Sequence, residues 1–73
     1  MLTNILVVAR HGSWAVQREG GDELLSGLSE EEAIDAGREM ARLDRVGFVI
    51  YGPDGRPRES YSYEGVAEWH RLR

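Results

Sequence analysis

The stretch SEEEAIDAGREMARL, residues 29–43, decides the fold. It opens with a capping box, in which the Ser29 hydroxyl can accept the backbone N–H of Glu32 while the Glu32 carboxylate accepts the N–H of Ser29. On a helical wheel its apolar and small residues gather on one half, and its charged residues occupy the other. The stretch therefore predicts one amphipathic helix that packs on a partner layer.

The centre of the apolar half is formed by Ala33, Gly37 and Met40. A glycine inside a helix costs about 1 kcal/mol relative to alanine. We therefore expect a packing reason for Gly37, namely a close approach of the helix to a sheet.

Short apolar, β-branched or alternating runs on both sides of the helix predict strands at residues 5–9, 14–18, 48–51 and 58–63. Turn signals lie at residues 11–13 and 52–56, where glycine, proline and aspartate favour tight turns. The expected fold is α+β with the order β-β-α-β-β, a four-stranded antiparallel sheet with one helix packed on one face. Counted along the chain, the expected strand order is 2-1-3-4.

The length of 73 residues limits the chain to one small domain with a thin core. We expect this domain at residues 1–65 and a tail or short helix at residues 66–73. The core is expected to consist of the following residues: Val7, Trp14, Val16, Ile34, Gly37, Met40, Ala41, Phe48 and Ile50.

The composition excludes several classes of protein. Cysteine is absent, so disulfides, thiolate metal sites and a cysteine nucleophile are excluded. No apolar run approaches the roughly 18 residues of a membrane span, and we expect a soluble, cytoplasmic protein without a membrane partner. All nine basic residues are arginines, and they stand against thirteen acidic ones, for a net charge of −4.

The side chains that could carry chemistry are few and dispersed. His11 has Ser13 nearby but no third group, and His70 lies far along the chain beside Trp69. The acidic run at residues 30–32 is accounted for by helix capping. We therefore expect no catalytic residue, no cofactor and no metal site, and interpret the protein as a non-enzyme.

The first and third predicted strands are apolar on both faces, although one helix can cover only one face. Monomers rarely expose a large apolar patch, so we expect a second copy in a homodimer, a protein partner, or the tail with Val66, Trp69 and Leu72 to cover the other. The candidate interface residues are Leu6, Val8, Val49, Tyr51, Tyr61, Tyr63 and Trp69.

Nucleic-acid binding is the alternative function. Arginines flank both predicted hairpins, and tyrosines lie in the second one, a combination that can contact phosphates and stack on bases. The net charge of −4 disfavours this alternative. The candidate contacts are Arg10, Arg18, Arg56 and Arg58.

Three spaced motifs resemble one family. They are Gly12-x-Trp14-x-Val16-x-Arg18-Glu19-Gly20, then Glu32-Ala33-Ile34 with Arg38 and Ala41-Arg42, then Ile50-x-Gly52-x-Asp54-Gly55-Arg56 with Glu59 and Tyr63. Over residues 4–63 the chain resembles the bacterial family known as domain of unknown function 2188. The chain departs from that family in lacking lysines, in having Gly37 where alanine is usual, and in its tail from Glu64 onward. The resemblance implies a small standalone bacterial or phage-borne domain and transfers no catalytic residue.

Overall fold

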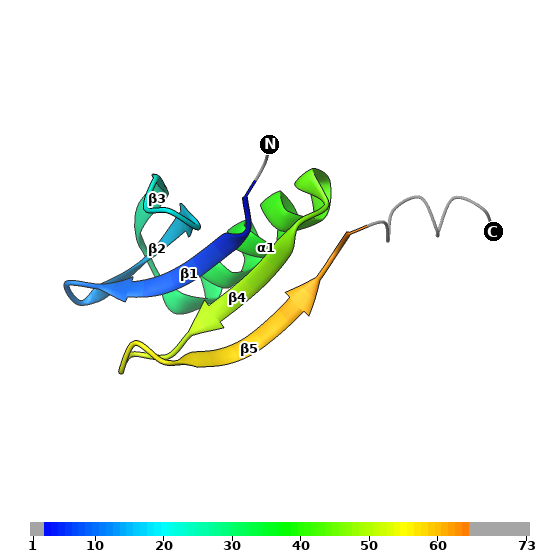
Figure 1. Cartoon of the computed structure of the whole chain (residues 1–73). Coiled ribbons are helices and arrows are strands. Elements are labelled where there is room, and N and C mark those ends of the chain that lie inside the picture. The colour runs from blue at the N-terminus through cyan, green and yellow to red at the C-terminus, as the bar shows by residue number, and fades with distance from the viewer. Residues whose placement is uncertain (1–2, 65–73) are drawn as a thin grey trace.

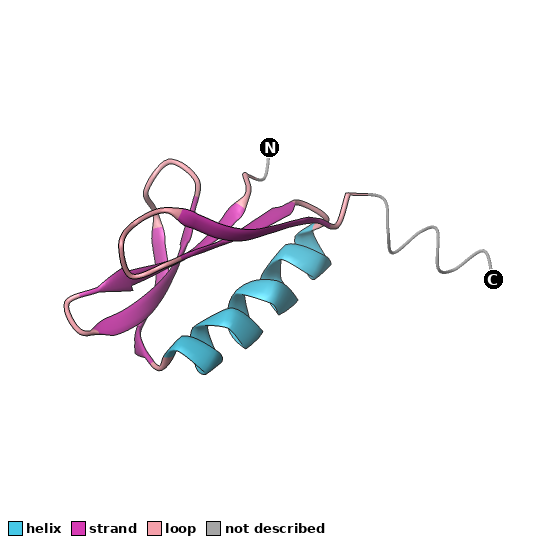
Figure 2. Ribbon diagram, turned by 90° about the horizontal axis from the view of Figure 1, so that it is seen from below, coloured by secondary structure: helices cyan, strands magenta, loops and turns pink. Residues whose placement is uncertain are grey.

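The computed structural model describes residues 3–64, which form a five-stranded sheet with one helix on one face (Figure 1). The elements in chain order are β1 (Ile5–Arg10), β2 (Ser13–Arg18), β3 (Glu23–Leu28), α1 (Glu30–Asp44), β4 (Gly47–Tyr51) and β5 (Pro57–Ser62). The strands lie side by side in the order β3-β2-β1-β4-β5. Figure 2 shows α1 lying along one side of the sheet, with no other described element on the opposite side.

The structure confirms the α+β class and the single helix on one face, but the four-stranded antiparallel sheet is wrong. The sheet is mixed, because β1 pairs with β4 in parallel while the other neighbouring pairs are antiparallel. The difference follows from β3, which was not expected. An added strand before the helix reverses the direction in which the chain enters the helix, and so reverses β4 relative to β1.

β3 has a weak strand signal for a physical reason. Its sequence ELLSGL does not alternate, five of its six residues are exposed, and only Leu28 is half-buried. Its pairing with β2 is interrupted by register shifts, and Gly27 has a φ of 70°. An irregular edge strand of this kind lacks the period-two pattern that identifies a half-buried strand.

The ends of α1 agree with the capping prediction. The Ser29 hydroxyl accepts the Glu32 N–H at 3.1 Å, and the Glu32 carboxylate accepts the Ser29 N–H at 2.9 Å. At the other end Arg45 takes the left-handed conformation with a φ of 60°, and its N–H is bonded to the carbonyl of Ala41. Within residues 3–64 no helix is long and apolar enough to cross a membrane.

The core lies between α1 and the sheet. Of the predicted core residues, Val7, Val16, Gly37, Ala41, Phe48 and Ile50 are buried, as expected. Trp14, Ile34 and Met40 are instead partly buried and pack at the margin. The buried residues of this core that were not predicted are Ile5, Ala33 and Val46. Ala15 is also buried, but as the partner of Val8 it lies on the other face of the sheet.

Gly37 marks the closest approach of α1 to the sheet. A Cβ atom added at this position would lie 2.8 Å from Cε1 of Phe48 and 2.9 Å from Cγ2 of Val7. Both distances are shorter than real Cβ contacts allow, so a side chain at position 37 would displace one of these buried neighbours. The packing reason expected for Gly37 is therefore confirmed.

We predict that Gly37→Ala lowers the stability of the domain. The substitution gains about 1 kcal/mol of helix propensity, but overpacking of a filled core costs about 1–3 kcal/mol. Chemical denaturation should show a lower midpoint for Gly37→Ala than for the parent. In the double variant Gly37→Ala, Val7→Ala, the loss of stability should be smaller than the sum of the losses in the two single variants. The reason is that the Val7 methyl group next to the added Cβ is absent. A Gly37→Ala protein as stable as the parent would contradict the prediction.

Candidate functional site

The face of the sheet opposite α1 carries apolar side chains from two neighbouring strands, β1 and β4. Side chains alternate along a strand, so the buried Ile5 and Val7 of β1, and Phe48 and Ile50 of β4, face the helix. Their neighbours turn the other way and are only partly buried. These neighbours form what is here called the open-face patch: Leu6, Val8, Val49 and Tyr51.

The pairing of β1 with β4 makes this patch continuous. Leu6 and Val49 are direct partners in the parallel register, so their side chains lie next to each other. A hollow of about 310 Å³ adjoins the patch and extends to the turn between β4 and β5. Its lining consists of Leu6, Val8, Ala9, Gln17, Tyr51, Gly52, Pro53 and Gly55. The patch is therefore a continuous apolar surface with a hollow beside it.

Three polar side chains border the patch on the β2 and β3 side. Gln17 is the antiparallel partner of Leu6, which places it on the same face. Arg10 donates to the Gln17 side-chain carbonyl at 2.6 Å and to the Glu23 carboxylate at 3.3 Å. These contacts hold one positive and one negative side chain together beside the apolar residues.

Two of the predicted interface tyrosines lie on the other face. Tyr61 is the partner of buried Phe48, and their rings stack with centroids 6.2 Å apart, so Tyr61 lies on the helix side. Tyr63 packs against the core cluster, and its N–H is bonded to the carbonyl of Val46 at 3.2 Å. The expected grouping of Tyr61 and Tyr63 with the open-face residues is therefore wrong, and Trp69 lies outside the described residues.

The four arginines predicted as nucleic-acid contacts do not form one cluster. Arg18, at the end of β2, donates to the Asp44 carboxylate at 2.7 Å and to the backbone carbonyl of Thr3 at 3.2 Å. It therefore joins β2 to the end of α1. Arg10 is held on the open face, as described above.

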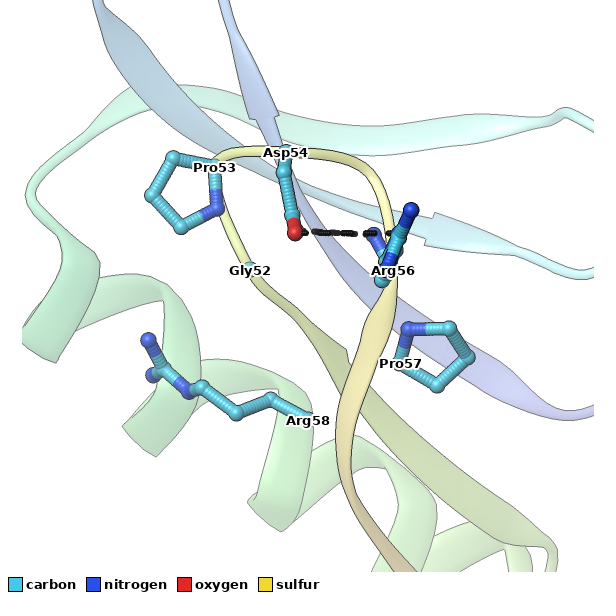
Figure 3. A pocket seen from close by; sticks show the side chains of 6 residues that line it. All are labelled: Gly52, Pro53, Asp54, Arg56, Pro57 and Arg58. Carbon is cyan, nitrogen blue, oxygen red and sulfur yellow. Dashed lines mark hydrogen bonds and ion pairs between the residues drawn. The ribbon is translucent and has the colours of Figure 1, made fainter.

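Arg56 and Arg58 do share a hollow, of about 480 Å³, at the turn between β4 and β5 (Figure 3). Asp54 lies inside this turn, where its carboxylate accepts the backbone N–H of Arg56 at 3.1 Å. Arg58 reaches toward α1 and donates to the Glu30 carboxylate at 2.6 Å, which raises the pKa of Arg58 above its ordinary value. Acidic partners thus accompany both arginines.

His11 and Ser13 lie at the turn between β1 and β2. His11 occupies the turn between β1 and β2 with a φ of 52°, beside a hollow of about 400 Å³ that Trp14 and Pro53 also line. The Ser13 hydroxyl donates to the backbone carbonyl of Arg10 at 3.2 Å. Among residues 3–64, no group of three or more histidine, aspartate or glutamate side chains could hold a metal ion.

The family model described as "Uncharacterized protein conserved in bacteria (DUF2188)" matches residues 5–63. The chain belongs to this family. No curated protein and no solved structure matches the chain.

The matched region runs from the start of β1 to the residue after β5, so the DUF2188 domain includes the whole sheet, the helix and the open-face patch. Three glycines of the family motifs have backbone conformations that favour glycine. Gly12, Gly20 and Gly55 have φ values of 82°, 108° and 83°, which a residue with a Cβ adopts only under strain. These motif positions define turns.

We predict that Tyr61 titrates above an ordinary tyrosine. Its hydroxyl donates to the Glu59 carboxylate at 2.6 Å, and this hydrogen bond, followed by the charge of Glu59, raises the pKa of Tyr61. A raised pKa means that the contact stabilises the fold at lower pH and is lost as the pH rises through the folded-state pKa. The difference between ultraviolet titrations of the parent and Tyr61→Phe isolates this group.

Glu59→Gln should move the Tyr61 transition to lower pH because it removes the negative charge. Glu39→Gln, which removes a carboxylate bound to Arg42 on α1, serves as the control and should leave the transition in place. An unchanged transition in Glu59→Gln would show that the contact does not form in solution.

Proposed function

We propose that this DUF2188 domain is a non-catalytic interaction module that binds a second copy of itself through the open-face patch. The observation that carries the proposal is the set of four apolar side chains on a sheet face that no described element covers. An antiparallel or mixed sheet with one face in water is expected to alternate between apolar and polar residues. β1 and β4 do not alternate in this way.

The chemistry of the open face supports a second copy as the occupant. A two-fold interface uses the same patch on both subunits, so an apolar patch is complementary to itself. The bordering charges, Arg10 and Glu23, balance each other. Although the whole chain has a net charge of −4, two open faces can therefore approach without bringing like charges together. Arg10 of one copy can then bind Glu23 of the other copy in place of its own Glu23.

We predict a dimer at micromolar concentration that a charge in the patch dissociates. Leu6→Glu and Val49→Glu each place two carboxylates in an apolar interface, where burying unpaired charges is strongly unfavourable. Light scattering should report a dimer for the parent and monomers for both variants. Circular dichroism should show that the subunits stay folded.

Leu43→Glu is the matched control, because Leu43 is 67% exposed on α1 and lies away from the open face. This variant should remain dimeric. A monomeric parent, or a dimer that survives both Leu6→Glu and Val49→Glu, would refute the proposal of face-to-face association.

Nucleic-acid binding is the second candidate function, and one observation favours it. Arg56 and Arg58 line the same hollow at an exposed turn. Two observations disfavour it: both arginines have acidic partners, Asp54 and Glu30, and the chain is acidic overall. The open-face patch therefore provides better support for function than the turn does.

We expect no salt-dependent binding to a pool of random oligonucleotides. Binding that relies on phosphate contacts weakens as salt rises, because counterions are released when the complex forms. Fluorescence anisotropy at several salt concentrations tests this expectation. Binding that weakens with salt, that Arg56→Ala or Arg58→Ala reduces, and that Arg42→Ala on α1 leaves unchanged would favour the nucleic-acid alternative.

A further inference from the structure

Residues 54 and 55 are the one Asp–Gly pair of the sequence, which contains no Asn–Gly pair. Such a pair is prone to spontaneous isomerisation, because glycine has no side chain to hinder attack by its nitrogen on the preceding carboxyl group. Gly55 has a φ of 83°, and apart from its chain neighbours nothing lies within 4 Å of the position of an added Cβ. The Asp54 side chain is 66% exposed. Sequence and exposure therefore mark a site where the chain can modify itself.

The reaction needs no reagent other than water. The Gly55 nitrogen attacks Cγ of the protonated Asp54 side chain and forms a C–N bond, while the proton of the nitrogen and the hydroxyl of the carboxyl group leave as one water. Water then adds to a carbonyl carbon of the succinimide ring and breaks the bond from that carbon to the nitrogen. Opening at the original main-chain carbonyl leaves isoaspartate, which has the same mass as aspartate.

Two hydrogen bonds of the folded turn between β4 and β5 oppose the first step. The Gly55 N–H, which the reaction must remove, is donated to the carbonyl of Gly52 at 3.0 Å. The Asp54 carboxylate accepts the backbone N–H of Arg56 at 3.1 Å, and the close view of the turn shows this contact (Figure 3). Both bonds must break before the ring can close. An exposed side chain is therefore held in an unreactive arrangement.

Two further features hold this turn closed. The Gly52 N–H is donated to the carbonyl of Arg56 at 2.8 Å, which joins the two ends of the turn. Pro53 has its φ fixed by its ring, so the open turn gains less conformational freedom than it would with another residue. The protection of Asp54 is thus a property of the turn itself.

Isomerisation would damage the turn that protects the site. In isoaspartate the main chain runs through Cβ and Cγ of residue 54, so the turn becomes one atom longer. The carboxylate that bonds the Arg56 N–H becomes part of the main chain, and that hydrogen bond is lost. Because this turn sets the register of β5 against β4, the modified chain should form the hairpin less well than the parent.

We propose that Asp54 is a modification site controlled by the fold: the closed turn between β4 and β5 suppresses succinimide formation, and opening of the turn releases it. The rate of modification then follows the fraction of time that the turn is open. Isoaspartate at residue 54 is consequently a record of past opening of this hairpin. The inference depends on the turn alone and is independent of the open-face patch.

The test compares isomerisation of the full chain at one pH and temperature with and without guanidinium chloride. Trypsin cleaves after arginine but not before proline, so residues 46–58 form one peptide in which Asp54 is the one acidic residue. Reversed-phase chromatography separates its two isomers. Because two hydrogen bonds must break in the folded state, isoaspartate should accumulate about tenfold or more slower there than in denaturant. Asp54→Glu should give a single peak, because its longer side chain does not form the five-membered ring.

Pro53→Gly tests whether the turn itself provides the protection, because it loosens the turn and leaves Asp54 and Gly55 in place. It should speed isomerisation of the folded protein about two- to fivefold and leave the rate in denaturant unchanged. Ser29→Ala is the matched control, because it weakens the cap of α1 instead, and it should leave the folded rate at the parent value. Equal rates in folded and denatured parent, no acceleration in Pro53→Gly, or the same acceleration in Ser29→Ala would overturn the inference.

Discussion

The rest of the structure depends on the parallel pairing of β1 with β4. Among residues 3–64, four of the five largest fully buried side chains come from these two strands: Ile5, Val7, Phe48 and Ile50. A side-chain hydrogen bond holds the pair at its start, where Oδ1 of Asn4 accepts the Gly47 N–H at 2.9 Å. Parallel neighbours require a crossover connection, and α1 is that crossover. The helix therefore covers one face of the sheet and leaves the other open.

The sequence was sufficient for local structure and for the order 2-1-3-4 of the four predicted strands, but it predicted neither β3 nor the direction of β4. The capping box and the apolar half of residues 29–43 predicted α1, because both signals depend only on neighbours within a few residues. The turns at Gly12 and Gly55 were predicted for the same reason. The direction of β4 depends instead on how many strands precede the helix. β3 lacks alternation and is exposed, so the strand that determines this direction was the one with the weakest local signal.

For the candidate surface, too, the sequence predicted the face of some residues and not of others. Period-two alternation alone predicted that Leu6, Val8, Val49 and Tyr51 share a face, because both faces of β1 and β4 are apolar. The faces of Tyr61 and Tyr63 depend on the register of β5 against β4. That register is set by the length of the turn at residues 52–56 and by the irregular pairing between Ile50 and Tyr51. A shift of one residue moves every side chain of a strand to the other face, so the placement of these tyrosines required the structure.

The ion pairs of the arginines explain why we base the proposed function on apolar groups rather than on charge. Within residues 3–64, six arginines form ion pairs with carboxylates of the same chain, and the seventh, Arg45, also has an interaction partner. The pair with the least exposed side chains, Arg18 with Asp44, joins β2 to the end of α1. At six of these guanidinium groups an anionic ligand would have to compete with a carboxylate of the same chain. A partner that packs on the open face gains apolar burial without displacing these carboxylates.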